Sequence, residues 1–395
     1  MEFVKGLRRF RIFQHSQTNP AEFHRHVIVA PNAAARLAGL DIFTEGYTIF
    51  QWTVFFGIFF IGVYLFNCAF TAYKVRNNTK DLIFCLVTFG MAPHESVKFY
   101  TFLFFREEFL WMHQYTMNLY REECCDRTIN MMMDNIFLLS VIVKMMMISY
   151  TFSIISIDLF PLAYSLITGE KIFPFGIYIP FVDHTTWFGY FVNFMLQVLL
   201  TLYVISESMG PDSMYMITMM SSFMQIDLLI LSLKDLSNKI LANDLNVEQN
   251  LKSIIKRYQE HVKYLETVES VYSIFFFVSF VSLAATLVLA LFAVVTLSWY
   301  QGYVFIAFIS YELFFSCFLG TILAVKSEQL QLAIYEVPWY KLSLPNQRSM
   351  QILLHASQKP VCLTLIFYPI DMPTFLQMYK TIYSIFTMLL TVREE

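Results

Sequence analysis

Residues 271–297 read VYSIFFFVSFVSLAATLVLALFAVVTL, a run of 27 residues without a charged side chain. The hydrocarbon core of a bilayer is about 30 Å thick, so a helix needs roughly 20 predominantly apolar residues to cross it. This run therefore predicts a transmembrane helix. Six other stretches have comparable length and apolar character, and they cover residues 47–73, 82–105, 135–160, 187–209, 302–325 and 374–392.

The composition of the whole chain agrees with a membrane protein. Of its 395 residues, 57% are hydrophobic and only 14% are charged, whereas soluble globular proteins carry about 25% charged residues. The net charge of −3 gives no basic field of the kind that binds nucleic acid. The six cysteines show neither a disulfide framework nor zinc-ligand spacing, and the sequence contains no catalytic motif. We therefore predict a protein without enzymatic activity, cofactor, metal or nucleic-acid partner.

One further apolar stretch, residues 214–236, makes the number of spans ambiguous between seven and eight. It follows the pair Gly210-Pro211, and its distal part contains Asp227, Lys234 and Asp235. These charges make it a poor lipid-facing segment, so we interpret it as a continuation of the fourth helix beyond a kink. This leaves an all-α membrane protein with seven transmembrane helices.

The distribution of basic residues predicts the orientation, because cytoplasmic loops are enriched in Lys and Arg. Nineteen of the 27 basic residues fall in the segments before residue 47 and at 106–134, 234–270 and 326–360, and only five fall on the opposite side. The N-terminus is therefore expected in the cytoplasm and the C-terminus outside. The expected division is a cytoplasmic segment 1–46, four spans within 47–233, a cytoplasmic helical segment 234–270, two spans within 271–325, a cytoplasmic segment 326–360 and a last span within 361–395.

Asn77-Asn78-Thr79 is a glycosylation sequon in the predicted first outer loop. Its position agrees with the orientation above, and a chance tripeptide is the alternative. We predict Asn77 as the modified residue.

Seven spans alone would suggest a G-protein-coupled receptor, but three features argue against that class. The N-terminus is predicted on the wrong side, no cysteine lies between residues 158 and 186, and the last span lacks an Asn-Pro-aromatic motif. A secondary transporter usually shows inverted repeats, and none is found here. The transporter is kept as an alternative of a different class.

Four ionisable residues lie within the predicted spans, where a charge is costly and often functional. Glu95 and Lys98 are three residues apart on one helix face, so we expect them to neutralise one another. Lys144 can extend its side chain to the interface. Glu312 is expected to face the protein interior, and Pro93-His94 predicts a kink with a hydrogen-bonded histidine.

The last part of the chain carries an ordered set of motifs: Ser327-Glu328, Tyr335-Glu336, Trp339-Tyr340, Arg348, Ser357-Gln358-Lys359-Pro360, Phe375, Lys380-Thr381-Ile382-Tyr383-Ser384 and Thr387 to Leu390. Their order and spacing over about 65 residues resemble the C-terminal signature of insect odorant receptors. The resemblance points to mosquitoes or other dipteran insects.

The resemblance implies a subunit of an odorant-gated, non-selective cation channel. Its implied partners are shared coreceptor subunits in a heteromeric tetramer, a small volatile ligand, cations in the pore and membrane lipid. The implied location is the plasma membrane of the dendrite or cilium of olfactory sensory neurons. The chain lacks the coreceptor's long insertion between spans four and five and its Val-Gln-Leu-Lys ending, so it resembles a tuning subunit. A gustatory channel remains the near alternative, although Leu389 and Leu390 are not followed by that branch's Gln-Phe.

In this family the cytoplasmic helical extensions pack into an anchor that holds subunits together. The segments 234–270 and 326–360 are polar but contain periodic apolar positions, which is typical of helices. Tyr335, Trp339 and Tyr340 are the side chains that the resemblance implies for the subunit interface, and packing within one subunit is the alternative.

The last span is expected to line the pore. A hydroxylated stripe recurs there at a spacing of three to four residues, which suits either a water-filled lumen or bonds between helices. Matching to the family places a hydrophobic gate near Ile385 and Phe386, and the predicted pore and gate residues are Thr381, Ser384, Ile385, Phe386, Met388 and Leu389. Asp371, Glu394 and Glu395 flank this helix. The two terminal glutamates are expected at the outer mouth of the pore, where negative charge concentrates cations.

The resemblance also implies an odorant pocket in the outer half of the bundle. In those half-spans the candidate residues are aromatic or aliphatic with few polar groups, as binding by apolar burial requires. For any one of them, core packing is the alternative. They are Phe84, Val87, Thr88, Met91, Ser149, Phe152, Ser153, Tyr190, Phe194, Gln197, Tyr303, Ala307 and Tyr311.

Overall fold

The computed structural model describes residues 19–41, 43, 51–122, 125–180, 182–297, 299–359 and 361–394. Over these ranges the chain is built from helices, and one isolated bridge pairs Thr364 with Pro369. The predicted outer-mouth residue Glu395 and the basic residues before position 19 lie outside the described ranges. The helices are α2 (Pro20–Leu37), α3 (Trp52–Val75), α4 (Thr79–Gly90), α5 (Ala92–Phe104), α6 (Arg106–Arg121), α7 (Asp126–Ile154), η2 (Ile155–Leu159), α8 (Phe160–Thr168), α9 (Trp187–Leu241), α10 (Val247–Leu297), α11 (Gln301–Tyr335), η3 (Trp339–Lys341), α12 (Leu344–Ser357) and α13 (Met372–Glu394).

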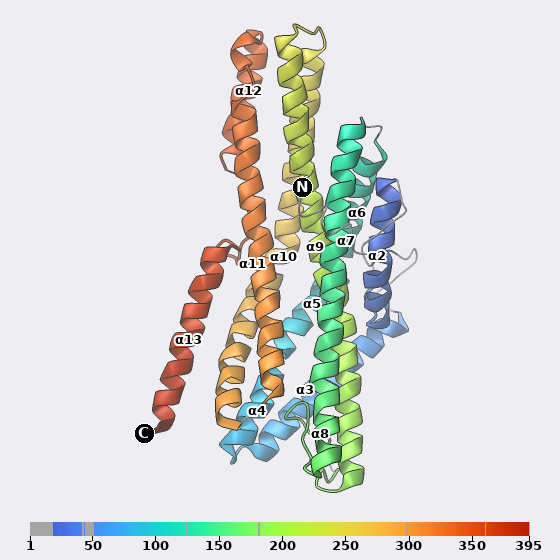
Figure 1. Cartoon of the computed structure of the whole chain (residues 1–395), viewed down its shortest axis with the longest axis vertical. Helices are drawn as coiled ribbons and strands as arrows, with labels where there is room; N and C mark the ends of the chain where they lie inside the picture. The colour runs from blue at the N-terminus through green and yellow to red at the C-terminus, as the bar shows by residue number, and fades with distance from the viewer. Residues whose placement is uncertain are drawn as a thin grey trace.

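The long helices α7, α9 and α11 run along the long axis of the molecule, whereas α3 and α5 are tilted to it (Figure 1). In the described part of the chain, five segments are long and apolar enough to cross a membrane: α3, α7 with α8, α9, α10 and α11. The pair α4 and α5 forms another crossing, which breaks at Met91 because Pro93 has no backbone N–H to donate. α13 is the remaining crossing, made less apolar by its Thr, Ser, Gln and Lys residues. The predicted all-α class with seven transmembrane helices is confirmed.

The ambiguous stretch 214–236 belongs to the 55-residue helix α9, which continues through Gly210 and Pro211. The prediction that it extends the fourth helix is therefore confirmed. Almost every residue from Ser213 to Leu229 is buried, because α2, α7, α10 and α11 pack around this part of α9. The stretch is apolar because it forms the protein core, and it does not cross the membrane a second time.

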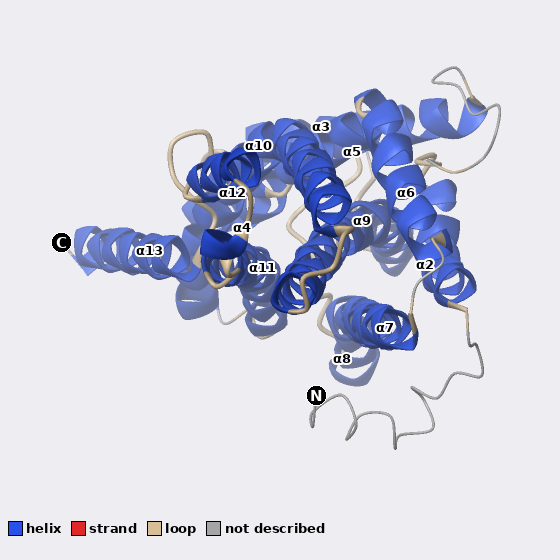
Figure 2. Cartoon of the chain, turned by 90° about the horizontal axis from the view of Figure 1, so that it is seen from above, coloured by secondary structure: helices blue, strands red, loops and turns tan. Residues whose placement is uncertain are grey.

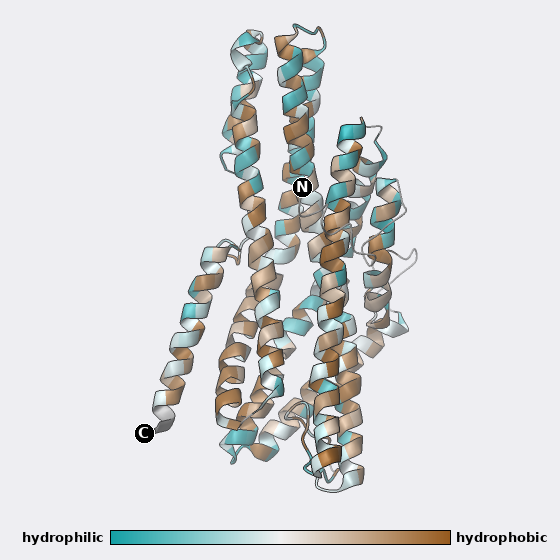
Figure 3. Ribbon diagram, viewed as in Figure 1, coloured by the Kyte–Doolittle hydropathy of each residue, from teal (hydrophilic) through white to brown (hydrophobic). Residues whose placement is uncertain are grey.

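The two ends of the molecule differ in polarity. Hydrophilic residues gather where α9 turns into α10 and where α12 lies, at the top of Figure 3, and apolar residues dominate the lower half. Lys326 of α11 pairs with Asp227 of α9, with 2.5 Å between Nζ and Oδ1. The helical character predicted for 234–270 and for the segment after 326 is thus observed as the ends of α9 and α11, the start of α10, and α12.

The start of α13 is fixed to its neighbours by three contacts. The carboxylate of Glu269 on α10 accepts a hydrogen bond from the Thr364 backbone N–H at 2.9 Å. The Met372 N–H donates to Oγ1 of Thr321 on α11 at 3.0 Å. Gly320 allows close approach of the preceding turn, because a Cβ at this position would lie 1.9 Å from the Ile370 carbonyl oxygen.

Beyond this attachment, α13 stands at the edge of the bundle (Figures 1 and 2). Ile382 is its buried residue among those whose side chains are described, at 3% exposure. Most of the other positions are exposed, so a membrane-crossing helix is left with little protein around it.

Candidate functional site

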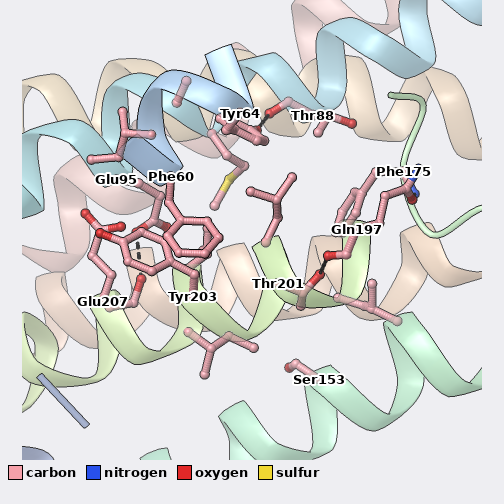
Figure 4. A pocket seen from close by; sticks show the side chains of 18 of the residues that line it. Phe60, Tyr64, Thr88, Glu95, Ser153, Phe175, Gln197, Thr201, Tyr203 and Glu207 are labelled. Carbon is pink, nitrogen blue, oxygen red and sulfur yellow. Dashed lines mark hydrogen bonds between the residues drawn. The ribbon is translucent and has the colours of Figure 1, made fainter. Parts of the chain in front are cut away.

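A cavity of about 100 Å³ lies in the apolar half of the bundle, between α3, α4, α5, α7, α9 and α11 (Figure 4). Aromatic and aliphatic side chains make up most of its wall. The lining residues are Phe60, Ile61, Tyr64, Thr88, Met91, Ala92, Glu95, Ser96, Tyr150, Ser153, Ile157, Phe175, Ile177, Gln197, Leu200, Thr201, Tyr203, Val204, Ile205, Glu207, Ser208, Phe305 and Phe308.

The loop between α8 and α9 closes one end of this cavity. The side chain of Gln197 holds it with two hydrogen bonds: Oε1 accepts from the Phe175 N–H at 3.0 Å, and Nε2 donates to the Ile177 carbonyl at 2.7 Å. Oδ1 of Asn193 accepts from the Ile179 N–H at 2.6 Å. Because these side chains satisfy the loop's backbone groups, the loop can bring apolar residues into the bundle without leaving polar atoms unpaired.

Aromatic rings form much of the cavity wall, and those of Phe60 and Tyr203 lie toward the end opposite Gln197 (Figure 4). The Phe60 and Tyr203 rings stack with centroids 4.9 Å apart. The Tyr64 hydroxyl donates to the Thr88 carbonyl, so this ring presents its apolar face to the space. Such a wall binds small molecules by removing apolar surface from water.

Carboxyl groups gather at the end of the cavity opposite Gln197 (Figure 4). Glu95 accepts a hydrogen bond from the Ser208 hydroxyl at 2.7 Å. Glu207 is completely buried, and neither of its carboxylate oxygens has a hydrogen-bond partner among the described residues. A polar group in this state is unusual, since most buried polar atoms are paired.

A buried ion cluster lies directly behind this end. Nζ of Lys98 is 2.8 Å from Oε1 of Glu312 and 3.1 Å from Oδ2 of Asp212. The Lys98 side chain is only 1% exposed. Nε2 of His94 is 2.9 Å from the same Glu312 oxygen. The Tyr150 hydroxyl donates to Asp212. The cluster therefore joins α5, α7, α9 and α11.

This cluster corrects one sequence expectation and completes another. Lys98 contacts Asp212 and Glu312 and not Glu95, because residues distant in sequence reach its ammonium in the folded bundle. Glu312 does face the interior, and its partners are His94 and Lys98. The kink predicted at Pro93 is present at the α4–α5 break.

The structure places the predicted odorant residues in several environments. Thr88, Met91, Ser153 and Gln197 line the cavity. Tyr190 and Phe194 pack on Phe173 in a separate buried cluster. The remaining candidates lie outside the cavity: Val87 is buried, Phe84 packs against the Trp299 ring, Ser149 is partly buried, Phe152, Tyr303 and Ala307 are exposed, and Tyr311 borders a smaller space beside Asp212.

Sequence reasoning missed the α3 residues and the α9 residues beyond Gln197. A signal for the latter exists: Leu200, Thr201 and Val204 follow Gln197 at i+3, i+4 and i+7, so they continue its helix face. No local pattern singles out Phe60 or Tyr64, because α3 is apolar on all sides.

The predicted pore and interface residues are largely uncovered within this chain. Thr381, Ser384, Ile385, Met388 and Leu389 are exposed on α13, and Phe386 is partly buried. Tyr335, Trp339 and Tyr340 are exposed where α11 ends and η3 follows, and Asn77 is exposed between α3 and α4. No group of three or more metal-ligating side chains occurs in the described ranges.

Comparison with known proteins identifies the family. Residues 78–383 match the family described as 7tm Odorant receptor. A Drosophila melanogaster protein assigned as odorant receptor 83c is 23% identical over 94% of this chain and 98% of its own length, and odorant receptor 33a of the same species is 25% identical over 57% and 61%. The solved insect olfactory receptor OR5 from Machilis hrabei, in complex with eugenol, has a similar fold, with a TM-score of 0.75 and 16% identity over 94% of this chain and 98% of that one. This multi-pass membrane protein belongs to the insect odorant receptor family.

Proposed function

We propose that this chain is the ligand-tuning subunit of an odorant-gated, non-selective cation channel that assembles with shared coreceptor subunits. The observation that carries the proposal is the contrast between a mostly apolar cavity inside the bundle and a membrane helix, α13, that is largely uncovered beside it. The first suits a small volatile ligand. The second suits a helix whose exposed surface contacts the helices of other subunits and the water in a pore.

The proposed orientation has the α9–α10 turn and α12 in the cytoplasm and the α8–α9 loop outside. The excess of basic residues on the first side supports it. In this orientation the cavity lies in the outer half of the membrane, where a volatile arriving from outside reaches it through the α8–α9 loop. The proposed location is the plasma membrane of olfactory sensory neurons, and exposed Asn77 becomes available for glycosylation.

The size of the cavity supports a small ligand. An apolar protein cavity of about 150 Å³ holds benzene, so a space of about 100 Å³ accepts a molecule of similar size after small side-chain movements. We propose Thr88, Met91, Ser153 and Gln197 among the ligand contacts, together with Phe60, Tyr64 and Tyr203.

The pore proposal concerns α13. Thr381 and Ser384 lie on an exposed face, which suits a water-filled lumen, and Ile385, Phe386 and Leu389 supply apolar side chains for a gate. Exposed Trp339 and Tyr340 are suited to a subunit interface, because large aromatic side chains dominate such contacts.

Whole-cell recording in cells that coexpress this chain with an insect coreceptor tests the proposal. Volatile compounds are expected to evoke cation currents that are absent from cells with the coreceptor alone. Currents that need no coreceptor would contradict the tuning-subunit assignment. Ion-coupled accumulation of a solute would instead indicate a transporter.

A further inference from the structure

The polar end of the cavity has an imbalance of charge. Glu95, Glu207, Asp212 and Glu312 supply four carboxyl groups within the membrane, whereas Lys98 supplies one fixed cation. Lys98 is in contact with Asp212 and Glu312, and the histidine beside this cluster, His94, also contacts Glu312. Nε2 of His94 also lies 4.0 Å from Oε1 of Glu95, so among these four carboxyl groups Glu207 is the one with no cation in contact within the described chain.

Glu207 is the least satisfied of these groups. It has 0% exposure, and the described chain gives neither of its oxygens a hydrogen-bond donor. The charged groups that act on it through space are Glu95, a like charge, and Lys98, which is already in contact with two other carboxylates. Burying an unpaired carboxylate is costly, so the site favours a cation or a proton at this position.

Glu207 lies in the wall of the ligand cavity itself, next to a second unpartnered polar atom. The hydroxyl of Tyr203 is buried and has no hydrogen-bond partner among the residues that the structure describes. Gly57 leaves room for this hydroxyl, since a Cβ at position 57 would lie 2.7 Å from its oxygen. Both groups gather with Glu95 at one end of the cavity in Figure 4. The stacked rings of Phe60 and Tyr203 add aromatic surface that attracts cations.

We propose that the cavity selects small apolar amines, whose protonated nitrogen binds the Glu207 carboxylate with the Tyr203 hydroxyl as a second partner. The inference rests on the proposed function, in which this cavity is the odorant site. The hydrocarbon part of the amine lies among Tyr64, Met91 and Leu200. A primary alkylamine is protonated at neutral pH, as the lysine side chain is.

Three probes of nearly equal shape test the proposal on cells that coexpress the chain with a coreceptor: cyclopentylamine, cyclopentanone and methylcyclopentane. The amine is expected to activate at a concentration at least about tenfold lower than the other two. Glu207→Gln keeps the size of the side chain but removes its charge, and it is expected to raise the half-activating amine concentration about 30-fold. The response to methylcyclopentane is expected to change by less than about threefold.

Asp158→Asn is the matched control. Asp158 is also a buried carboxylate with one oxygen that has no hydrogen-bond partner in the described ranges. It lies in η2 and does not line the cavity, and its other oxygen accepts a hydrogen bond from Thr201, an acceptor that Asn retains. Its substitution is expected to leave the preference for the amine unchanged. Tyr203→Phe, which removes the hydroxyl alone, is expected to weaken the amine response about threefold to tenfold.

Two results would overturn the proposal while leaving the proposed channel function intact. One is an amine response that Glu207→Gln does not change. The other is a ketone response stronger than the amine response, because Glu207 would then be a neutral carboxyl that donates to an acceptor. Ligand-induced thermal stabilisation of the purified complex tests amine binding without gating, so it still decides the matter if a variant conducts no current or if the channel function fails.

Discussion

The helical bundle around the cavity and the helix α13 both span the membrane, but they differ in how much of their surface the rest of this chain covers. The bundle pairs many of its polar groups within one chain, through the Lys98 cluster and through side chains such as Gln197 that hold the α8–α9 loop, and Glu207 is an exception. α13 is fixed at its start and exposed along most of its described length. The proposed ligand cavity is thus formed within a single chain, whereas most of the surface of α13 is not covered by the described part of this chain.

The largest effect is expected from breaking the ion cluster of the bundle. Lys98→Met leaves Asp212 and Glu312 buried without their ammonium partner, and removal of one member of a buried ion pair costs about 3–5 kcal/mol. We expect loss of folded protein at the cell surface. Thermal unfolding of the purified protein, measured by fluorescence-detected size-exclusion chromatography, gives the change in stability.

Lys252→Met provides the matched control, because this lysine is also ion-paired but exposed. Its Nζ lies 2.7 Å from the Glu248 carboxylate on the surface of α10. Exposed helical pairs of this spacing contribute about 0.3–0.5 kcal/mol, so its substitution is expected to have little effect. Equal losses of thermal stability in Lys98→Met and Lys252→Met would show that the buried cluster stabilises the fold no more than an exposed ion pair does.

The second prediction compares two isoleucines three residues apart on α13. Ile382 is 3% exposed and Ile385 is 44% exposed. Ile382→Ala is expected to destabilise the subunit by about 2–5 kcal/mol through a cavity against the bundle. Ile385→Ala is expected to leave the subunit stable and to alter the basal current of the assembled channel. The two measurements are the stability of the purified chain and the current at equal surface expression. If Ile385→Ala reduced the stability and Ile382→Ala did not, the assignment of the exposed face of α13 would be wrong.

These differences show what the sequence can predict and what it cannot. The lengths of the apolar runs predicted the spans, and Asp227 correctly indicated that residues 214–236 do not face lipid, since it pairs with Lys326. The partners of Lys98 were not predictable from spacing, because Asp212 and Glu312 are more than 100 positions away along the chain. The cavity wall was only partly predictable, because helix periodicity identifies a face but not which part of that face is left unfilled.

The third prediction weakens the attachment of α13 to the bundle. In Gly320→Ala the added methyl group would meet the Ile370 carbonyl, so the turn before α13 must move. Overpacking of this kind costs about 1–3 kcal/mol, and we expect reduced maximal current with unchanged ligand-induced thermal stabilisation. Gly62→Ala on α3 is the control, since a Cβ there has no neighbour within 4 Å. A parallel loss of ligand binding in Gly320→Ala would contradict the separation between cavity and α13.

The smallest effect is expected from low pH, which is expected to destabilise the packing of α2 and α6 in the helical bundle. His24 is buried with its ring 5.9 Å from that of His113 and 5.0 Å from that of Tyr120, and neither ring nitrogen has a partner among the described residues. Burial, with repulsion from His113, lowers the pKa of His24 to about 3, and burial, with Arg25 and Arg121, lowers the pKa of His113 to about 4.

The unfolded chain therefore binds more protons than the folded chain between pH 6.5 and about 4, so stability is present above pH 6.5 and declines as the pH falls. At pH 5 the loss from His24 is about 2 kcal/mol at most. Hydrogen exchange at pH 7.5 and pH 5, corrected for the intrinsic rates, should show faster opening of α2 and α6, whereas α13 contains no histidine and should not respond. His24→Phe keeps an aromatic ring in the same space without the titrating nitrogens, so it should reduce the acid sensitivity. His355→Phe, at an exposed position on α12, should not. If acid opened α13 as readily as α2, the packing of the two regions would be coupled after all.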